Sequence, residues 1–394
     1  MNIPFLTQDL RGELELRLSK VRREMKEEKL DAVLIASSVN MYYMSGCVFR
    51  GYVYITVDRD PVYFLIAPSF SDDRGCVEIH KPEQIAAHID EYGIGSPTRL
   101  GLEFSDMLYS DIERLKKCFP QSQIADASMA MRRARIIKTV YEIRKIREDG
   151  LHQAAVYSQV HKCHQEGMTD LELQIEIERV LRREGCLGIL RAAGNRMELN
   201  LGSVISGDNA DIPSPYDFAM GGEGTDPSLP VGANGVTLRP GTVVMVDMNG
   251  GFNGYQSDMT RCWSIGEVPA LARKAHECSR HIVRRLEEIG RPGLPVSRMY
   301  SDAIEIAKEE GVHEYFMGYH YKARFIGHGL GIELNEMPVI MERNHVQLKE
   351  NMVIALEPKF VIPHVGAVGV ENTYRVTEMG LENLTPFPEE LTEL

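Results

Sequence analysis

Two aspartates flank a turn in the second half of the chain. The apolar run at 243–246 leads into Asp247, a turn rich in Gly and Asn follows, and a second strand-like segment carries Asp258. If the turn is centred between Phe252 and Asn253, the aspartates lie directly opposite each other in a hairpin, with Cβ atoms about 4.5–5.5 Å apart. Two carboxylates that close beside a buried strand need a proton or a cation between them. The alternative is a solvated hairpin edge, where both side chains reach water.

Three further segments add ionisable side chains at strand-like positions. His328 lies between two glycines, where the backbone can come close to whatever the imidazole binds. Glu357 ends an apolar run just before a proline, and Glu371 lies in another strand-like stretch. Taken singly, a buried glutamate is more often hydrogen-bonded structure than a ligand. With the aspartates, however, these residues make an oxygen-rich set suited to two divalent transition ions such as Mn, Co, Fe or Zn. Two ions about 3.5–4 Å apart would make a bound water a nucleophile near neutral pH.

The composition limits the partners of the protein. The chain of 394 residues has 44 Lys and Arg against 57 Asp and Glu, a formal charge of −13. This acidic balance argues against binding to nucleic acid or to an anionic membrane. No apolar run approaches the roughly 20 residues of a membrane helix, and the N-terminal residues open no signal peptide. Seven scattered cysteines without a C-x-x-C pair indicate thiols in a reducing compartment. The sequence therefore predicts a cytoplasmic protein.

The elements that must position these residues fall into two parts. Strands and helices alternate over the first third, which predicts an α/β domain with helices at 9–30 and 83–92 and strands at 32–35, 52–57, 61–66 and 99–103. A basic, helix-forming stretch at 131–146 is expected to be an exposed linker. The second part groups its helices and hairpins in blocks, which is typical of an α+β domain. Its helices are expected near 169–184, 269–289 and 298–310, and its strands within 241–265, 324–334, 351–362 and 368–377.

The segment from Val246-Asp247 to the run 255–261, Tyr-Gln-Ser-Asp-Met-Thr-Arg, is similar to a signature of the pita-bread metallopeptidases, V-D-x-G…G-Y-x-S-D-x-T-R. This family includes methionine aminopeptidase, aminopeptidase P, prolidase and the non-peptidase creatinase. The resemblance covers nearly the whole chain. It implies an α/β creatinase/prolidase-like N-terminal domain at 1–135, followed by an α+β pita-bread catalytic domain at 136–394. It also implies metal ligation by Asp247, Asp258, His328, Glu357 and Glu371.

The same resemblance implies a function. The expected activity is that of a metal-dependent Xaa-Pro peptidase, a dipeptidase or an aminopeptidase, which hydrolyses the amide bond preceding proline in short peptides. In the family two divalent ions (Mn, Co, Zn or Fe) hold a hydroxide that attacks the scissile carbonyl, and the residue at the Glu357 position shuttles the proton. A homodimer is expected by analogy with relatives.

The chain departs from the family at three positions. Ser214 stands where proline-specific relatives carry a histidine in an N-A-x-x-P-H-Y element, and Asn335 stands where they carry a histidine in an H-E element. Gly369 replaces an arginine two residues before the last glutamate. The missing groups orient the substrate and stabilise the oxyanion, and losing such a donor costs about 10²–10³ in rate. Asn335 and Arg324 are therefore candidate catalytic residues beside Glu357.

Tyr216 and Arg261 are further candidates to replace the missing groups, and Tyr255 and Thr260 are expected to brace the aspartates. The departures, together with a long loop at 206–235, leave a second function open. This is a non-peptidase metal-dependent hydrolase or lyase of the same fold that acts on a small molecule. A binding protein without turnover is a third possibility, which the complete ligand set disfavours because unused buried carboxylates are costly.

Overall fold

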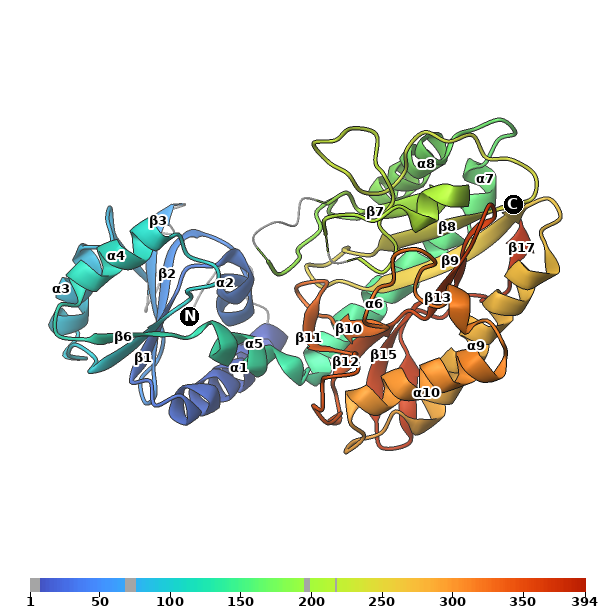
Figure 1. Ribbon diagram of the computed structural model, residues 1–394. Coiled ribbons are helices and arrows are strands. Elements are labelled where there is room, and N and C mark those ends of the chain that lie inside the picture. Colours follow the sequence, from blue (N-terminus) through green and yellow to red (C-terminus); the bar gives the residue numbers. More distant parts are fainter. Residues whose placement is uncertain (1–7, 68–75, 195–198, 217) are drawn as a thin grey trace. The chain divides into compact units, whose positions relative to one another are not determined.

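The computed structural model describes residues 8–67, 76–194, 199–216 and 218–394 (Figure 1). The chain divides into two compact units, Met1–Arg135 and Ile136–Leu394. No helix in the described ranges is both long enough and apolar enough to cross a membrane.

Unit 1 is an α/β domain, as the alternating pattern predicts. Its six-stranded sheet has the order β4-β3-β2-β1-β5-β6, with antiparallel pairing along β1-β2-β3 and parallel pairing of β1 with β5, β5 with β6 and β3 with β4. The core lies between the sheet and its helices and contains Leu34, Phe64 and Leu100. The elements are α1 (Gln8–Glu27), β1 (Ala32–Ile35), α2 (Ser38–Ser45), β2 (Arg50–Thr56), β3 (Val62–Ala67), β4 (Cys76–Glu78), α3 (Gln84–Glu91), β5 (Arg99–Leu102), α4 (Tyr109–Cys118), β6 (Gln123–Asp126) and α5 (Ser128–Ile136).

The described residues of unit 2 form three sheets, with the orders β17-β9-β8-β7, β11-β10-β12-β15-β16 and β13-β14. The elements are α6 (Val140–Tyr157), α7 (Val160–Cys163), α8 (Asp170–Arg183), β7 (Gly202–Ser206), η1 (Gly207–Asp211), β8 (Thr242–Asn249), β9 (Asp258–Ile265), α9 (Ala270–Ile289), α10 (Val296–Glu309), η2 (His313–Tyr315), β10 (Gly327–Gly329), β11 (Glu336–Val339), β12 (Val353–Leu356), β13 (Lys359–Ile362), β14 (Gly366–Gly369), β15 (Asn372–Thr377), β16 (Gly380–Asn383) and β17 (Thr392–Glu393).

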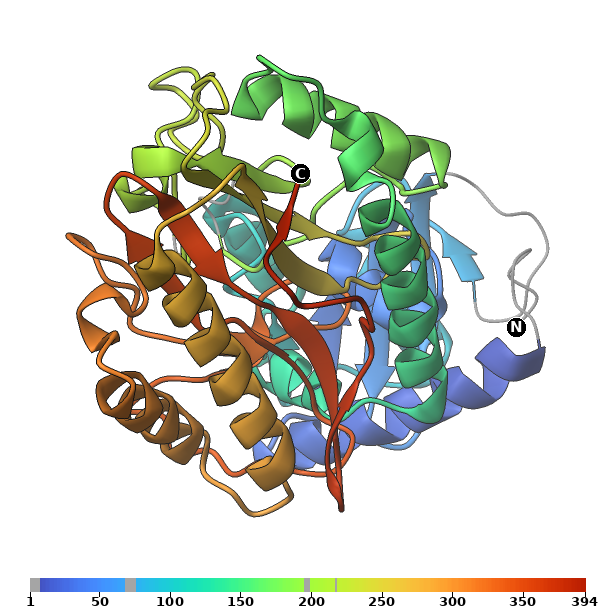
Figure 2. The same cartoon turned by 90° about the vertical axis from the view of Figure 1, so that its right-hand side faces the viewer.

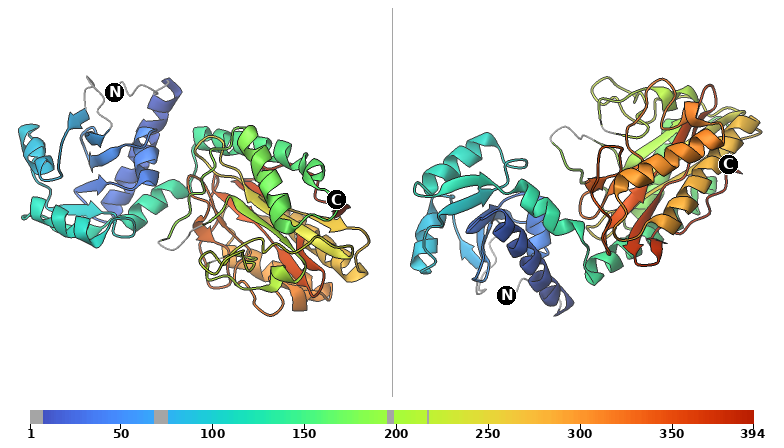
Figure 3. Two further views of the ribbon diagram at one scale, coloured as in Figure 1. Left: turned by 90° about the horizontal axis from the view of Figure 1, so that it is seen from above. Right: turned by 60° about the horizontal axis from the view of Figure 1, so that its bottom comes forward.

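The strands of unit 2 lie between two groups of helices, as Figures 2 and 3 show, with α6–α8 in green on one side and α9 and α10 in orange on the other. Side chains alternate between the two faces of a strand. On β8, Val244, Val246 and Met248 therefore pack in the core that contains α6–α8, and Val243 and Met245 pack in the core that contains α9 and α10. Burial on both faces explains the continuous apolar run before Asp247.

The stretch at 131–146 is not the exposed linker that its charges predict. It contains the end of α5 and the start of α6, which begins with a capping box formed by Thr139 and Glu142. Within unit 1, Arg135 is buried and donates to the side-chain oxygen of Asn40. Within unit 2, Lys138 is buried in an ion pair with Glu336 at 2.9 Å. Because each buried charge has a partner, these basic residues do not have to face water.

Candidate metal centre

The hairpin of β8 and β9 carries the two aspartates of the centre. Asp247 pairs with Thr260, and Asp258 pairs with Asn249. The prediction that the aspartates lie directly opposite each other is therefore wrong, because the turn is centred between residues 253 and 254, one position later than expected. Since the shift moves the pairing by two residues, Asp247 and Asp258 still point to one face as diagonal neighbours.

A buried carboxylate on α6 fixes the turn that joins these strands. Asp149 accepts hydrogen bonds from the backbone N–H groups of Gly251 and Phe252 and from Oγ of Ser257. A turn of this kind has several backbone donors that no strand can satisfy, so a nearby acceptor is needed. Sequence reasoning missed Asp149, although an aspartate in the middle of a packed helix is a usable signal. Burial raises its pKa to about 6, against the hydrogen bonds that lower it.

The raised pKa of Asp149 gives a testable pH dependence. In the unfolded chain the group titrates near its ordinary value of about 3.9. The folded state therefore holds the proton more tightly between about pH 4 and pH 6, and the stabilisation by Asp149 falls as the pH rises through this window. The difference in unfolding free energy between the unaltered chain and Asp149→Ala should be larger at pH 4 than at pH 7, by about 2 kcal/mol. Urea unfolding of both proteins at the two pH values measures it, and an equal difference at both would contradict the assignment.

The imidazole of the centre comes from β10, which lies between β11 and β12. A Cβ atom on Gly327 would meet the Ala355 carbonyl oxygen at 2.1 Å, and one on Gly329 would meet that of Met337 at 2.1 Å. Glycine is therefore needed on both sides of His328 to let the strands approach. Nδ1 of His328 lies 3.1 Å from the Gly329 carbonyl oxygen, to which it can donate. This hydrogen bond leaves Nε2 as the nitrogen with a free lone pair.

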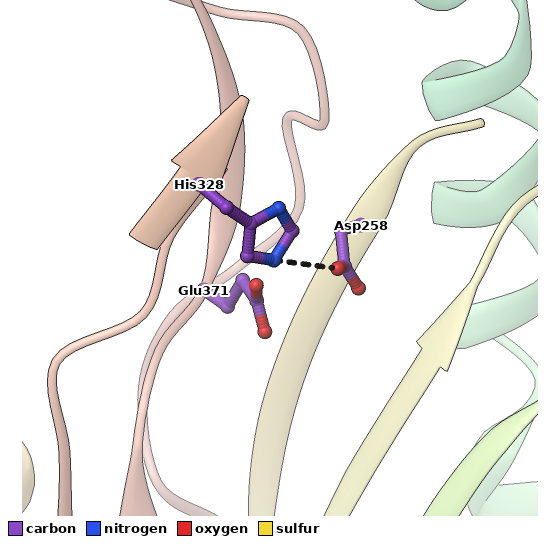
Figure 4. A group of neighbouring side chains, drawn as sticks. All are labelled: Asp258, His328 and Glu371. Atoms are coloured by element: carbon purple, nitrogen blue, oxygen red, sulfur yellow. Dashed lines mark ion pairs between the residues drawn. The ribbon is translucent and has the colours of Figure 1, made fainter. Parts of the chain in front are cut away.

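The five predicted ligands converge. Nε2 of His328 lies 3.7 Å from Asp258 Oδ2 and 3.7 Å from Glu357 Oε1. Figure 4 shows the imidazole, Asp258 and Glu371 pointing toward one another, and one ligand atom from each lies within 4.8 Å of the other two. Asp247, Glu357 and Glu371 form a second group by the same criterion. All five side chains line one cavity of unit 2.

Burial and mutual repulsion raise the pKa of two carboxyl groups of this centre. Desolvation, followed by the negative charges of the neighbouring carboxylates, raises the pKa of Asp258 well above its usual value. The same causes raise the pKa of Glu371 to about 8. Oε2 of Glu371 accepts a hydrogen bond from Thr260 at 2.7 Å, whereas Oε1 is buried and has no hydrogen-bond partner within the described residues. A crowded set of carboxylates with an unpaired buried oxygen and an available imidazole nitrogen fits a divalent cation.

A residue that sequence reasoning missed lies inside the centre. Lys359, the first residue of β13, has no exposed surface, and its Nζ donates to Asp247 Oδ2 at 2.7 Å, Glu357 Oε2 at 2.8 Å and Glu371 Oε2 at 3.0 Å. Burial alone would lower its pKa, but the three carboxylates raise it well above the usual value. The signal was a lysine within the apolar stretch 351–362, two residues after Glu357 and thus on the same side of an extended chain.

The other predicted catalytic residues have different positions. Asn335 lines the cavity, but its side-chain amide is engaged by the backbone of Ala193, accepting from N–H at 2.6 Å and donating to the carbonyl at 3.1 Å. Arg324 is exposed and is not among the described residues that line the cavity. It lies near Tyr300 instead: burial raises the pKa of that tyrosine, and the positive charge of Arg324 partly opposes the rise. Oγ of Ser214 accepts a hydrogen bond from the backbone N–H of Tyr216. The structure thus brings Asn335 to the centre and leaves Arg324 outside it.

The residues expected to brace the aspartates contact glutamates. Tyr255 donates its hydroxyl to Glu142 at 3.3 Å, and Thr260 donates to Glu371. Arg261 is buried and donates only to protein oxygens: the carbonyls of Thr260, Glu371, Phe387 and Pro388 and the side chain of Asn372. It therefore holds the backbone of one ligand in place rather than facing the cavity.

Gly369 stands directly opposite Lys359 in the pairing of β13 with β14. Its φ is +147°, and a Cβ atom would meet the Pro358 carbonyl oxygen at 2.7 Å and the Lys359 Cα at 3.0 Å. A side chain such as the arginine of relatives would require the backbone to move. The glycine at this position and the lysine across from it are therefore structurally linked.

Comparison with known proteins agrees with this architecture. Residues 144–378 match the model of metallopeptidase family M24, and residues 17–137 match that of the creatinase/prolidase N-terminal domain. An Xaa-Pro dipeptidase of Pyrococcus furiosus is 30% identical over 379 residues, which cover 95% of this chain and 99% of the relative. The solved prolidase of Pyrococcus horikoshii matches with a TM-score of 0.76 at 24% identity, covering 95% of this chain and 99% of that one. For an X-Pro aminopeptidase of Thermotoga maritima the TM-score is 0.77 at 21% identity, with 96% and 99% covered. The chain belongs to metallopeptidase family M24.

Proposed function

We propose that this protein is an Xaa-Pro peptidase, which hydrolyses the amide bond preceding proline in short peptides. The observation that carries the proposal is the convergence of His328 with four carboxylates around one cavity. It is supported by membership of a metallopeptidase family and by the relative named Xaa-Pro dipeptidase, which matches this chain over nearly its whole length.

In this proposal, His328, Asp258, Glu357 and Glu371 hold a divalent ion, which is Mn, Co, Zn or Fe. Such an ion supplies Lewis acidity, which polarises a carbonyl and makes a nearby water more acidic. Glu357 accepts the proton of the attacking water and delivers it to the leaving amine. The sequence predicts a second ion beside Asp247, a position that Lys359 shares.

The cavity walls away from the ligands suit an apolar substrate group. They include the side chains of Leu190, Phe218, Phe325 and Leu334. An apolar wall beside a few placed polar groups is typical of a small-ligand site. We propose that this wall binds the proline ring of the substrate or the apolar side chain next to it. Asn335 fixes the backbone at Ala193 through two hydrogen bonds.

A second candidate is the non-peptidase hydrolase or lyase of the same fold. The observation that favours it is the pairing of Asn335 with the backbone of Ala193, because an amide engaged in this way replaces the histidine expected of a proline-specific relative. On this alternative the substrate is a small molecule that needs no charged donor at that position.

A substrate panel separates the two candidates. The chain is stripped with chelator, reloaded with Mn, Co or Zn, and assayed on Ala-Pro, Leu-Pro and Leu-Pro-Ala, with Ala-Ala and Leu-Ala as matched peptides without proline. Release of the N-terminal residue only from the proline peptides is the expected result. A metal-loaded chain that cleaves none of them would contradict the peptidase proposal and favour the small-molecule reaction.

We also propose that the domain limits are 1–135 and 136–394.

We propose that the protein is a homodimer. The support for the dimer is analogy with relatives. Size-exclusion chromatography with light scattering tests it, and a mass of one chain across micromolar concentrations would contradict it.

A further inference from the structure

Lys359 places a positive charge where the family pattern predicts a metal ion. Its ammonium lies between Asp247, Glu357 and Glu371, which form one of the two groups able to hold a metal. We propose that this ammonium takes the place of one ion, so that the chain binds a single divalent ion, on the side of the centre that holds Asp258 and His328. The inference deepens the proposed function and rests on it for the role of that metal.

The two oxygens of each glutamate that Lys359 contacts have different surroundings. Oε2 of Glu357 and Oε2 of Glu371 accept from the ammonium. The other oxygen of Glu357 lies 3.7 Å from the imidazole nitrogen, and the other oxygen of Glu371 has no hydrogen-bond partner within the described residues. Each glutamate therefore gives one oxygen to the lysine and keeps the second for an ion beside His328.

The position of Lys359 is fixed by its surroundings. Its carbonyl oxygen accepts from the backbone N–H of Met317, and its strand is paired along β14. The preceding carbonyl, of Pro358, accepts from the buried hydroxyl of Ser279, which in turn accepts from the backbone N–H of Val370. Because the side chain is fully buried and the backbone is held on both sides, moving the ammonium aside for a second ion would break its three ion pairs.

The ammonium already supplies one of the positive charges that the centre needs. Four ionised carboxylates stand against it, which leaves three negative charges for a metal to meet. One divalent ion brings the formal charge to −1 and a second would bring it to +1, so the charge count does not require a second ion. An ion beside Asp247 would also lie next to the ammonium, and the repulsion of two cations is strong where water is excluded.

The experiment counts bound metal in the full chain. Protein stripped with chelator is dialysed against Mn²⁺, and metal per chain is measured by mass spectrometry of the digested protein. One ion is expected for the unaltered chain, two for Lys359→Met, one for Asp247→Asn and none for Asp258→Asn. Lys138→Met is the matched control. It removes a buried ammonium that is paired with a single carboxylate, Glu336, outside the centre, and this variant should still bind one ion.

Electron paramagnetic resonance gives a second readout that does not depend on turnover. An isolated Mn²⁺ gives resolved hyperfine lines, whereas two ions about 3.5–4 Å apart are coupled. The unaltered chain should give the isolated spectrum and Lys359→Met the coupled one. Two ions or a coupled spectrum in the unaltered chain would overturn the inference, as would no ion at millimolar Mn²⁺ or one ion in folded Lys359→Met. If that variant does not fold, the unaltered chain and Asp247→Asn still decide.

The outcome is separable from that of the proposed function. One bound ion without hydrolysis of proline peptides would count against the peptidase alone. Hydrolysis by a chain with two bound ions would count against the role of Lys359 alone.

Discussion

Replacing Asp258 with asparagine should lower metal-dependent turnover more than about 100-fold, since even the loss of a group that only supports a metal ligand costs about 10–100-fold. The backbone of Asp258 is held by Thr373, which accepts from its N–H at 2.9 Å and donates to its carbonyl at 3.0 Å. The variant should therefore keep the strand in place. Because burial, and after it the neighbouring carboxylates, disfavour the charged form of Asp258, the metal-free variant should unfold at the same or a higher temperature. Steady-state kinetics and calorimetry measure the two effects.

Asp302→Asn is the control for this prediction. Asp302 is also a buried aspartate of unit 2, but it pairs with Arg298 within α10 and is not among the described residues that line the cavity. Its replacement should change stability and leave kcat within a few fold. An Asp258→Asn protein that retained most of its turnover would show that Asp258 is not a ligand.

Arg261→Met should destabilise the protein by about 4 kcal/mol or more, because each buried acceptor left without a donor costs about 1–3 kcal/mol. The guanidinium donates to five oxygens, and methionine fills part of the volume without supplying any donor. Arg261→Lys should rescue little, since an ammonium cannot reproduce the planar set of donors. Urea unfolding at neutral pH measures the loss, and metal affinity should fall with it because the Glu371 backbone is one of the acceptors.

The matched control is Arg179→Met on α8. Arg179 is half exposed and pairs with Glu176 at 2.7 Å, so its loss should cost no more than about 1 kcal/mol. If Arg261→Met were as mild as this control, the buried network around Glu371 would not contribute to stability.

Local patterns were sufficient to predict much of the fold. The apolar spacing at 9–30, 269–289 and 298–310 predicted α1, α9 and α10, and the Thr169–Glu172 spacing predicted the capping box of α8. The strand-like stretch 324–334 was too long, since only Gly327–Gly329 pair with neighbouring strands as β10. The linker at 131–146 was misjudged, because its buried charges are paired with residues distant in sequence, which no local pattern reveals.

The sequence was sufficient to predict which residues form the candidate site, but not how their charges are arranged. Each of the five residues lies in or beside a strand-like stretch, so their types and positions were informative before any fold was known: Asp247, Asp258, His328, Glu357 and Glu371. The exact pairing of the β8–β9 hairpin could not be predicted. It depends on the turn between the strands, and that turn is held by Asp149 from α6.

Lys359 escaped prediction for a different reason. A lysine is among the residues least often buried, so a sequence pattern assigns it to the surface unless its partners are known. The three carboxylates that allow its burial come from β8, from the end of β12 and from the segment after β14. The pairing of Lys359 with Gly369 is likewise visible only once β13 and β14 are aligned.

The acceptors of Arg261 bear on how the protein forms during synthesis. Two of them, the carbonyls of Phe387 and Pro388, lie 126 and 127 positions after the arginine. A nascent chain that still holds these residues in the ribosome has made Asp247 and Asp258 but cannot complete the network behind Glu371. Unit 1 contains all its strands before residue 136 and can fold while translation continues. In unit 2 the hydrogen bonds that hold the Glu371 backbone through Arg261 can be completed only after residues 387 and 388 have left the ribosome.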